Sequence, residues 1–168
     1  LQRLLALQPG ETLLDVGCGS GWFTRRLDAN GDCGVTGLDN DAARLRFAQA
    51  HGHNERYLQG DARALPFADA SIDCVVSVAA LCFVADWRQA LREMARVARR
   101  RVVVGLLNRH SLLWREKGSG EGGYRGAHWH RRGEIRARRF GRRVVIPTIV
   151  VEQLLNATDD LRPDDSVS

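Results

Sequence analysis

The sequence predicts one α/β domain whose central sheet is doubly wound, with helices on both faces. Two observations predict this fold. Short apolar runs alternate with helical patterns, and a glycine-rich stretch, residues 17–21, directly follows the first run. Such alternation is typical of a parallel sheet, because parallel strands need long crossover connections. The 168 residues, 44% of them hydrophobic, are enough for one core.

Five apolar runs predict the strands. They are short and rich in Val, Leu and Ile, as is expected of strands that are buried on both faces. The predicted strands cover residues 12–16, 34–39, 56–61, 71–81 and 101–107, and a further strand-like run covers residues 142–151.

Helical patterns connect these runs. Asp41 and Asp86 precede two of them and are expected to be N-caps, while Gly52 follows one and is expected to end it. The predicted helices cover the end of residues 1–8, then residues 21–31, 41–52 and 86–99.

The charge is uneven along the chain. Residues 88–143 carry 17 basic and 4 acidic side chains, whereas residues 1–87 carry 7 and 11. A basic block of this kind suits an acidic partner, but it is also typical of solvated helix faces. Both interpretations stay open at this point.

The cysteines and the chain ends suggest the setting. Four cysteines without a CxxC pair predict free thiols in a cytoplasmic protein and no metal site. No apolar run approaches the ~20 residues that a membrane span needs. The first residue is Leu1, so we expect natural N-terminal residues to be missing. We expect residues 1–156 to form the domain and residues 157–168 an acidic, disordered tail.

The glycine-rich stretch predicts a ligand site. In doubly wound sheets, ligands bind beyond the carboxyl ends of the strands. Gly17 would allow a sharp turn, and Gly19 and Gly21 would let backbone N–H groups approach a ligand. A dinucleotide fingerprint needs glycine where this sequence has Trp22, and Asp15 would place a carboxylate beside a pyrophosphate. The stretch therefore favours a cationic ligand.

Aspartates end three successive predicted strands: Asp15, Asp39 and Asp61. A carboxylate at Asp39 can take both hydroxyls of a ribose. Asp61 can accept from an adenine amino group, with the Ala62 N–H nearby. Together the three acids predict a cationic ligand that has an adenosine end.

With these motifs the sequence resembles the class I S-adenosylmethionine-dependent methyltransferases, in the group that includes quinone-biosynthesis methyltransferases. LLDVGCGSG resembles the first motif of that family, and GLDNDAARLRFA, GDARALPFADASIDCVVS and ALREMARV resemble later segments. The resemblance covers most of residues 8–135. It implies a Rossmann-like fold and direct methyl displacement from S-adenosylmethionine, which leaves S-adenosylhomocysteine.

The resemblance also implies where the cofactor binds, and it places residues 77–84 along the methyl-transfer channel. Cys82 in that channel is expected to be a small buried hydrophobe rather than a nucleophile. The implied cofactor-binding residues are Asp15, Gly17, Cys18, Gly19, Gly21, Asp39, Asn40, Asp61, Ala62 and Val78.

Three departures from the family pattern lead to further expectations. Arg99, Arg100 and Arg101 stand where the family has a Pro-Gly-Gly turn, so this turn must be built differently. The family ends in an antiparallel hairpin, but only residues 142–151 look strand-like here, so we expect the last edge strand to be missing. Most of the N-terminal helix that often closes over the substrate is also expected to be absent.

Residues 108–135 are rich in Gly, His and aromatic residues, which is typical of a specificity loop over the site. Substrate contacts are expected from Tyr124, Arg125, His128, Trp129 and His130. His128, His130 and Tyr124 are the candidate catalytic residues, since histidine titrates near pH ~6.5 and can act as a general base. A solvated loop in which His130 caps a helix stays an equal alternative.

Three functions remain to be separated. The first is methyl transfer to a small molecule such as a quinone or a phenol. The second is methylation of RNA or protein through the Arg-rich residues 88–143, which would give binding a steep salt dependence. The third is cofactor binding without turnover. The sequence favours a small-molecule acceptor over nucleic acid, and it leaves the oligomeric state open.

Overall fold

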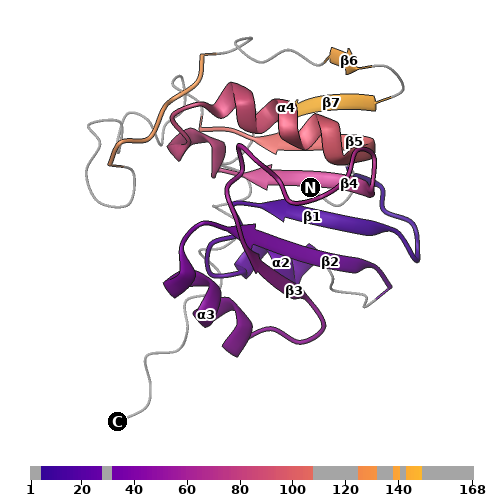
Figure 1. The fold of residues 1–168 in the computed structure, drawn as a ribbon, viewed down its shortest axis with the longest axis vertical. Helices are drawn as coiled ribbons and strands as arrows, with labels where there is room; N and C mark the ends of the chain where they lie inside the picture. The colour runs from indigo at the N-terminus through magenta and orange to yellow at the C-terminus, as the bar shows by residue number, and fades with distance from the viewer. Residues whose placement is uncertain (1–4, 28–31, 108–124, 132–137, 141–142, 149–168) are drawn as a thin grey trace.

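A seven-stranded sheet forms the centre of the computed structural model, which describes residues 5–27, 32–107, 125–131, 138–140 and 143–148. Its strand order is β3-β2-β1-β4-β5-β7-β6 (Figure 1). The chain winds outward from β1 through β2 to β3, and then returns beside β1 to form β4 and β5. This reversal confirms the doubly wound fold and places a switch point between β1 and β4.

The strands match the predicted runs closely, although their ends differ by a few residues. Strands β1 to β5 are parallel, β7 is parallel to β5, and β6 is antiparallel to β7. The strand bounds are β1 Thr12–Val16, β2 Gly34–Asp39, β3 Arg56–Gln59, β4 Ile72–Val78, β5 Ala98–Gly105, β6 Arg138–Phe140 and β7 Arg143–Thr148.

The helices connect these strands as expected. Asp41 caps α3 by accepting from two N–H groups of its first turn, and Asp86 caps α4 by accepting from the Gln89 N–H, so both predicted N-caps are confirmed. The described helices are α2 Trp22–Leu27, α3 Ala42–Ala50, the 3₁₀ turn η1 Leu81–Phe83, and α4 Trp87–Val97. None of them is long and apolar enough to cross a membrane.

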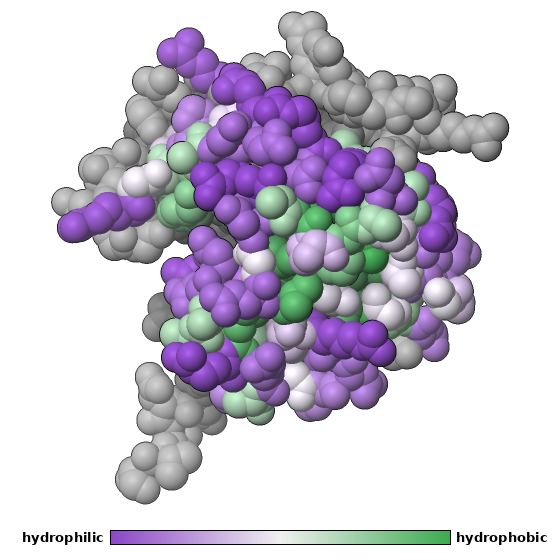
Figure 2. Space-filling view, viewed as in Figure 1, coloured by the Kyte–Doolittle hydropathy of each residue, from purple (hydrophilic) through white to green (hydrophobic). Residues whose placement is uncertain are grey.

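Two apolar clusters cover the two faces of the sheet. On one face, Met94 and Val97 of α4 pack with Val75 and Val102 of the strands. On the other face, Leu27 of α2 packs with Val76 and other strand residues. Figure 2 shows that the outer side of α4 is hydrophilic, which agrees with its amphipathic sequence. Helices therefore lie on both faces, as predicted.

Two expectations about the ends of the fold are wrong. The last edge strand is present, because residues 138–140 form the short strand β6, which pairs antiparallel with β7. The polar sequence of these three residues did not indicate a strand. The predicted helix over residues 1–8 ends by Leu5, because Ala6 has a positive φ of 41°. The predicted tail at 157–168 lies outside the described residues, and so does the proposed domain end at residue 156.

The three arginines that replace the expected turn are bonded within the protein. Arg99 pairs with Asp73 (2.7 Å), Arg100 pairs with Glu11, and Arg101 donates to the carbonyl of Leu5 (2.8 Å). Helix α4 passes directly into β5 at residues 97 and 98, without an intervening loop. This part of the basic block therefore stabilises the end of the sheet opposite the predicted ligand site.

Candidate functional site

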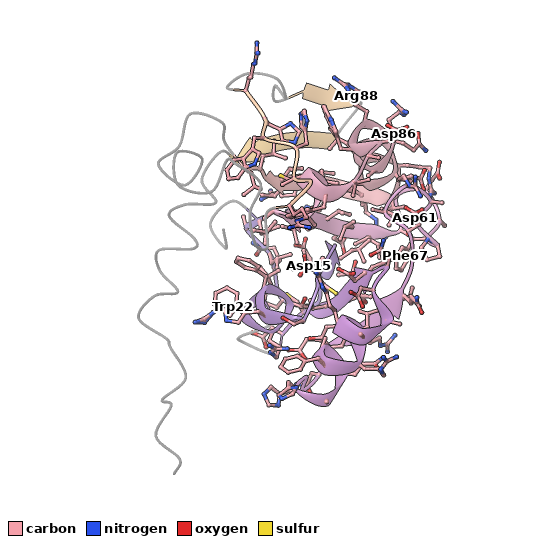
Figure 3. All side chains as sticks on the ribbon, turned by 90° about the vertical axis from the view of Figure 1, so that its left-hand side faces the viewer. Asp15, Trp22, Asp61, Phe67, Asp86 and Arg88 are labelled. Carbon is pink, nitrogen blue, oxygen red and sulfur yellow. The ribbon has the colours of Figure 1, made fainter. Side chains whose placement is uncertain are left out.

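A cavity of about 540 Å³ lies at the carboxyl ends of β1, β2, β3 and β4, where the switch point was predicted. Figure 3 looks onto this end of the sheet, with Asp15 near the middle and Asp61 to one side. This volume is in the usual range of small-molecule sites. The cavity is lined by Gly17, Leu38, Asp39, Asn40, Arg44, Gly60, Asp61, Ala62, Arg63, Val78, Ala79, Ala80, Phe83, Val84 and Ala85.

Six of the ten predicted cofactor residues line this cavity. The remaining four, Asp15, Cys18, Gly19 and Gly21, belong to the end of β1 and the loop that follows it. Cys18 is buried with its sulfur against Gly37. Burial and the nearby charges of Asp15 and Asp39 raise the pKa of its thiol, so Cys18 stays protonated. Its side chain therefore packs the loop against Gly37 of β2.

Most of the loop's backbone donors are used inside the protein. The Gly17 and Cys18 N–H groups both donate to the Leu38 carbonyl (2.7 and 3.1 Å). The Gly21 N–H donates to the Cys18 carbonyl (2.9 Å), and the Gly19 N–H donates to the carboxylate that ends β2 (2.8 Å). Close approach of a ligand to the backbone of Gly19 and Gly21 stays a prediction, although both N–H groups have acceptors within the protein. A pyrophosphate would find these four donors occupied.

Packing explains why two of the glycines are required. Gly17 has φ +76°, and a Cβ there would overlap the Cβ of Ala80. Gly21 has the same φ, and a Cβ there would lie 2.6 Å from the Tyr57 hydroxyl. Tyr57 also lies against Gly37 and Gly52. This support could not be predicted from local sequence patterns, because Tyr57 comes from β3, far along the chain.

Asp39 connects the loop with the start of α3. Its Oδ2 accepts from the Gly19 N–H (2.8 Å), and its Oδ1 accepts from the Asp41 N–H (2.9 Å). Asp39 is buried, yet it lines the cavity. Each carboxylate oxygen has two acceptor sites, so a ligand can still donate to Asp39.

Asp15 lies buried below the loop, and its Oδ2 accepts from the Thr24 hydroxyl (2.7 Å). Burial raises the pKa of this carboxyl to about 6, the Thr24 bond lowers it, and the charge of Asp39 raises it further. Within the described part of the chain, neither Asp15 nor Asp39 forms an ion pair. A cation bound here would offset both charges.

Asp61 lies on the far side of the cavity and pairs with Arg63. The Nε and Nη2 atoms of Arg63 donate to its carboxylate at 2.7–3.0 Å, as does the Arg63 N–H (2.8 Å). These bonds lower the pKa of Asp61, which stays ionised. Both side chains are about half exposed, so water screens this pair and it contributes little to stability.

Two of the candidate catalytic residues, His128 and His130, are not part of the cavity lining. His128 is exposed, whereas His130 is buried, and their rings meet edge to face at 4.5 Å. The His128 N–H donates to the Cys82 carbonyl (2.6 Å), which ties this segment to η1. Burial raises the pKa of the Cys82 thiol to about 11, in keeping with its predicted role as a hydrophobe. Tyr124 lies outside the described residues.

No three His, Cys, Asp or Glu side chains gather into a possible metal site in the described ranges. Arg125, which was also predicted to contact substrate, is exposed, and Trp129 packs partly buried against the core.

Comparison with known proteins identifies the family. Residues 14–104 match the family described as "Methyltransferase domain". The chain belongs to this family. The match begins within β1, ends within β5, and includes the whole described lining of the cavity. Together with the solved S-adenosylmethionine-dependent methyltransferases of similar fold, it supports S-adenosylmethionine as the cofactor of this methyltransferase domain.

Curated relatives of the methyltransferase domain act on different acceptors. A malonyl-[acyl-carrier protein] O-methyltransferase of Erwinia pyrifoliae is 44% identical over 101 residues, which are 58% of this chain and 38% of that protein. A ubiquinone/menaquinone biosynthesis C-methyltransferase of Legionella pneumophila is 39% identical over 105 residues, or 58% and 42%. The chain thus spans about two fifths of the length of these relatives.

Solved structures confirm the fold of the methyltransferase domain. An S-adenosylmethionine-dependent methyltransferase of Thermotoga maritima has a TM-score of 0.64 and 26% identity, and the match covers 79% of this chain and 63% of that one. A Haloferax volcanii methyltransferase in complex with the activator Trm112 has a TM-score of 0.58 and 31% identity, with 68% and 56% covered.

The raised pKa of Asp15 predicts how stability depends on pH. The folded protein binds this proton more tightly than the unfolded chain does, so the free energy of unfolding falls as pH rises from 3.8 to about 6. Asp15→Asn removes that loss and should raise the free energy of unfolding at pH 7 by up to about 3 kcal/mol. The same variant should bind S-adenosylmethionine more weakly, because the buried charge is gone.

Urea unfolding between pH 4 and 8 measures the first effect, and calorimetric titration measures the second. Asp32→Asn, at an exposed aspartate, is the control and should change neither. An Asp15→Asn protein that is less stable at pH 7 and keeps its affinity would show that this carboxylate is neither strained nor used for binding.

The contact between Gly21 and Tyr57 predicts a coupled pair of substitutions. Gly21→Ala should destabilise the protein by about 2–4 kcal/mol, since it adds a steric overlap to an unfavourable backbone conformation. Gly19→Ala is the matched control: its φ is also positive (+55°), but its Cβ would meet nothing within 4 Å, so only the backbone cost of about 1–2 kcal/mol remains.

Tyr57→Phe should restore part of the stability in the Gly21→Ala background, because it removes the overlapping hydroxyl. Chemical denaturation of the four proteins measures this coupling. Strictly additive changes in the free energy of unfolding would contradict a steric overlap between residue 21 and Tyr57.

Proposed function

We propose that this methyltransferase domain transfers the methyl group of S-adenosylmethionine to a small-molecule acceptor by direct displacement. The observation that carries the proposal is the pair of buried carboxylates, Asp15 and Asp39, beside a cavity and without an ion-pair partner among the described residues. Such a site disfavours a pyrophosphate and favours a ligand that brings its own positive charge.

The residues present suit each part of this cofactor. Asp39 is placed to accept from ribose hydroxyls, since it reaches the cavity and keeps acceptor capacity. We assign Asp61 and the Ala62 N–H to the adenine. The adenine amino group can donate to the Asp61 carboxylate, which also accepts from the exposed Arg63. We assign Asp15 and the loop of residues 17–21 to the positively charged amino-acid end.

When bound, the cofactor supplies a methyl group on a positively charged sulfur atom. The contribution of the protein is alignment and the exclusion of water, which can give effective molarities on the order of 10⁵ M or more. Residues 78–80 and 83–85 provide a wall of small and apolar side chains for this purpose. No metal is needed for the displacement.

We propose that the methyl acceptor binds against Phe83, which belongs to this wall. Phe83 is about half exposed and lines the cavity, so it offers a flat apolar surface to a quinone, a phenol or a similar metabolite. His128 lies on the segment bound to η1 and is our candidate for the general base when the attacking atom carries a proton. We assign buried His130 to holding this segment in place.

Two alternatives to a small-molecule methyltransferase are methylation of RNA and a different reaction on the same fold. Four of the arginines in residues 88–101 bond to acidic side chains or carbonyl groups, which leaves fewer of them for RNA. A different reaction on the same fold has a specific precedent. The [4+2]-cyclase SpnF matches with a TM-score of 0.55 and a sequence identity of 26%, over 59% of this chain and 39% of that one.

We also propose a cytoplasmic location, in keeping with four cysteines that are free thiols.

Calorimetric titration with S-adenosylmethionine, S-adenosylhomocysteine and NAD tests the proposal. The two adenosyl ligands should bind and NAD should not. Asp39→Ala should lower the affinity for S-adenosylhomocysteine by about tenfold to a hundredfold, because it removes charge-assisted hydrogen bonds.

Asp32→Ala is the matched control. Asp32 is exposed and lies outside the cavity lining, so affinity should stay the same. Binding of NAD, or equal loss of affinity in both variants, would contradict the proposed site.

A further inference from the structure

One side of α4 carries polar residues that contact the loop after β3. Gln89, Glu93 and Arg96 are spaced by four and three residues, so they lie on one side of the helix. The opposite side packs on the sheet. In the view of Figure 3, Asp61 and Phe67 of this loop lie on the same side of the molecule as Asp86 and Arg88 at the start of α4.

Arg96 is the centre of these contacts. Its Nε and Nη2 donate to the two carboxylate oxygens of Glu93 (2.8 and 2.7 Å). Its Nη1 donates to the Phe67 carbonyl and to Asp69 (both 2.8 Å), and its Nη2 also donates to the Leu65 carbonyl (3.0 Å). All five guanidinium N–H positions therefore have acceptors within the protein.

Further bonds join the same two segments. The Leu65 N–H donates to Glu93 (2.9 Å), and the Ala70 N–H donates to the Arg96 carbonyl (2.9 Å). Gln89 donates to the Arg63 carbonyl (3.3 Å). Since loop backbone groups must find partners, α4 determines the path of residues 63–70.

This loop begins in the wall of the cavity. Asp61, Ala62 and Arg63 line the cavity, and the contacts with α4 start at Arg63 and continue through buried Leu65. A turn from the Ala64 N–H to the Asp61 carbonyl (3.0 Å) links the two parts. A change in the path of residues 65–69 would therefore move the wall assigned to the adenine.

We propose that Arg96, held by Glu93, is a positioning residue that fixes the adenine end of the cofactor site through residues 61–70. The inference rests on the proposed function, because it assigns that end of the cavity to an adenine. Arginine is required here: its planar fork holds one carboxylate and three further acceptors at once, which the point charge of lysine cannot do.

Arg96→Lys and Glu93→Gln test this inference. Glu93→Gln keeps an oxygen for the Leu65 N–H but loses the charge. Each variant should bind S-adenosylhomocysteine about tenfold more weakly, an effect expected from losing charge-assisted hydrogen bonds. Hydrogen exchange should become faster at the Leu65 and Ala70 amides and stay unchanged in β1. Arg88→Lys is the matched control: Arg88 is exposed on the same helix and stacks on the Trp87 ring rather than on residues 61–70, so neither readout should change.

A double-substitution cycle separates positioning from general destabilisation. Asp61→Asn should cost less affinity in the Arg96→Lys background than in the wild type, because its carboxylate would already be displaced. Full affinity of both folded variants, or additive effects in the cycle, would overturn the positioning role. A wild-type chain that binds no adenosyl ligand would instead overturn the proposed function, and this inference with it.

Discussion

The buried residue Asp39 joins three parts of the site at the end of β2. Its carboxylate binds the Gly19 N–H of the loop and the Asp41 N–H at the start of α3, and its backbone carbonyl accepts the Gly60 N–H after β3 (2.9 Å). One residue therefore fixes the glycine loop, a helix start and the next strand end around the cavity. Four of the five loop amides, those of Gly17, Cys18, Gly19 and Gly21, donate to protein atoms, and the carboxylate of Asp39 lines the cavity beside them.

This arrangement has an electrostatic cost. Asp15 and Asp39 are both buried, and burial together with the charge of Asp39 raises the pKa of Asp15. The rest of the fold compensates with apolar packing on both faces of the sheet and with ion pairs at the opposite end. A positively charged ligand would reduce the same cost, which is why we propose a cationic ligand for this site.

Local signals in the sequence were sufficient for the centre of the fold. The strand ends at Asp15, Asp39 and Asp61 and the caps at Asp41 and Asp86 follow from short-range patterns, and the structure brings the first three to one edge of the sheet. Long-range contacts were not predictable in this way. Tyr57 against Gly21, Arg96 against residues 65–69, and the ion pairs of Arg99 and Arg100 depend on which segments meet in the folded chain. The short β6 strand was missed because its three residues, Arg138–Phe140, carry too little pattern.

We propose that Asp39 holds residues 17–21 in place before a ligand binds and then accepts hydrogen bonds from the ligand. NMR of the isotopically labelled chain during titration with S-adenosylhomocysteine tests both roles. The Gly19 amide should be protected from exchange without ligand, and the Asp39 carboxyl signal should shift in proportion to saturation. A Gly19 amide that exchanges freely until ligand is added, or an Asp39 signal that does not move at saturation, would contradict this proposal.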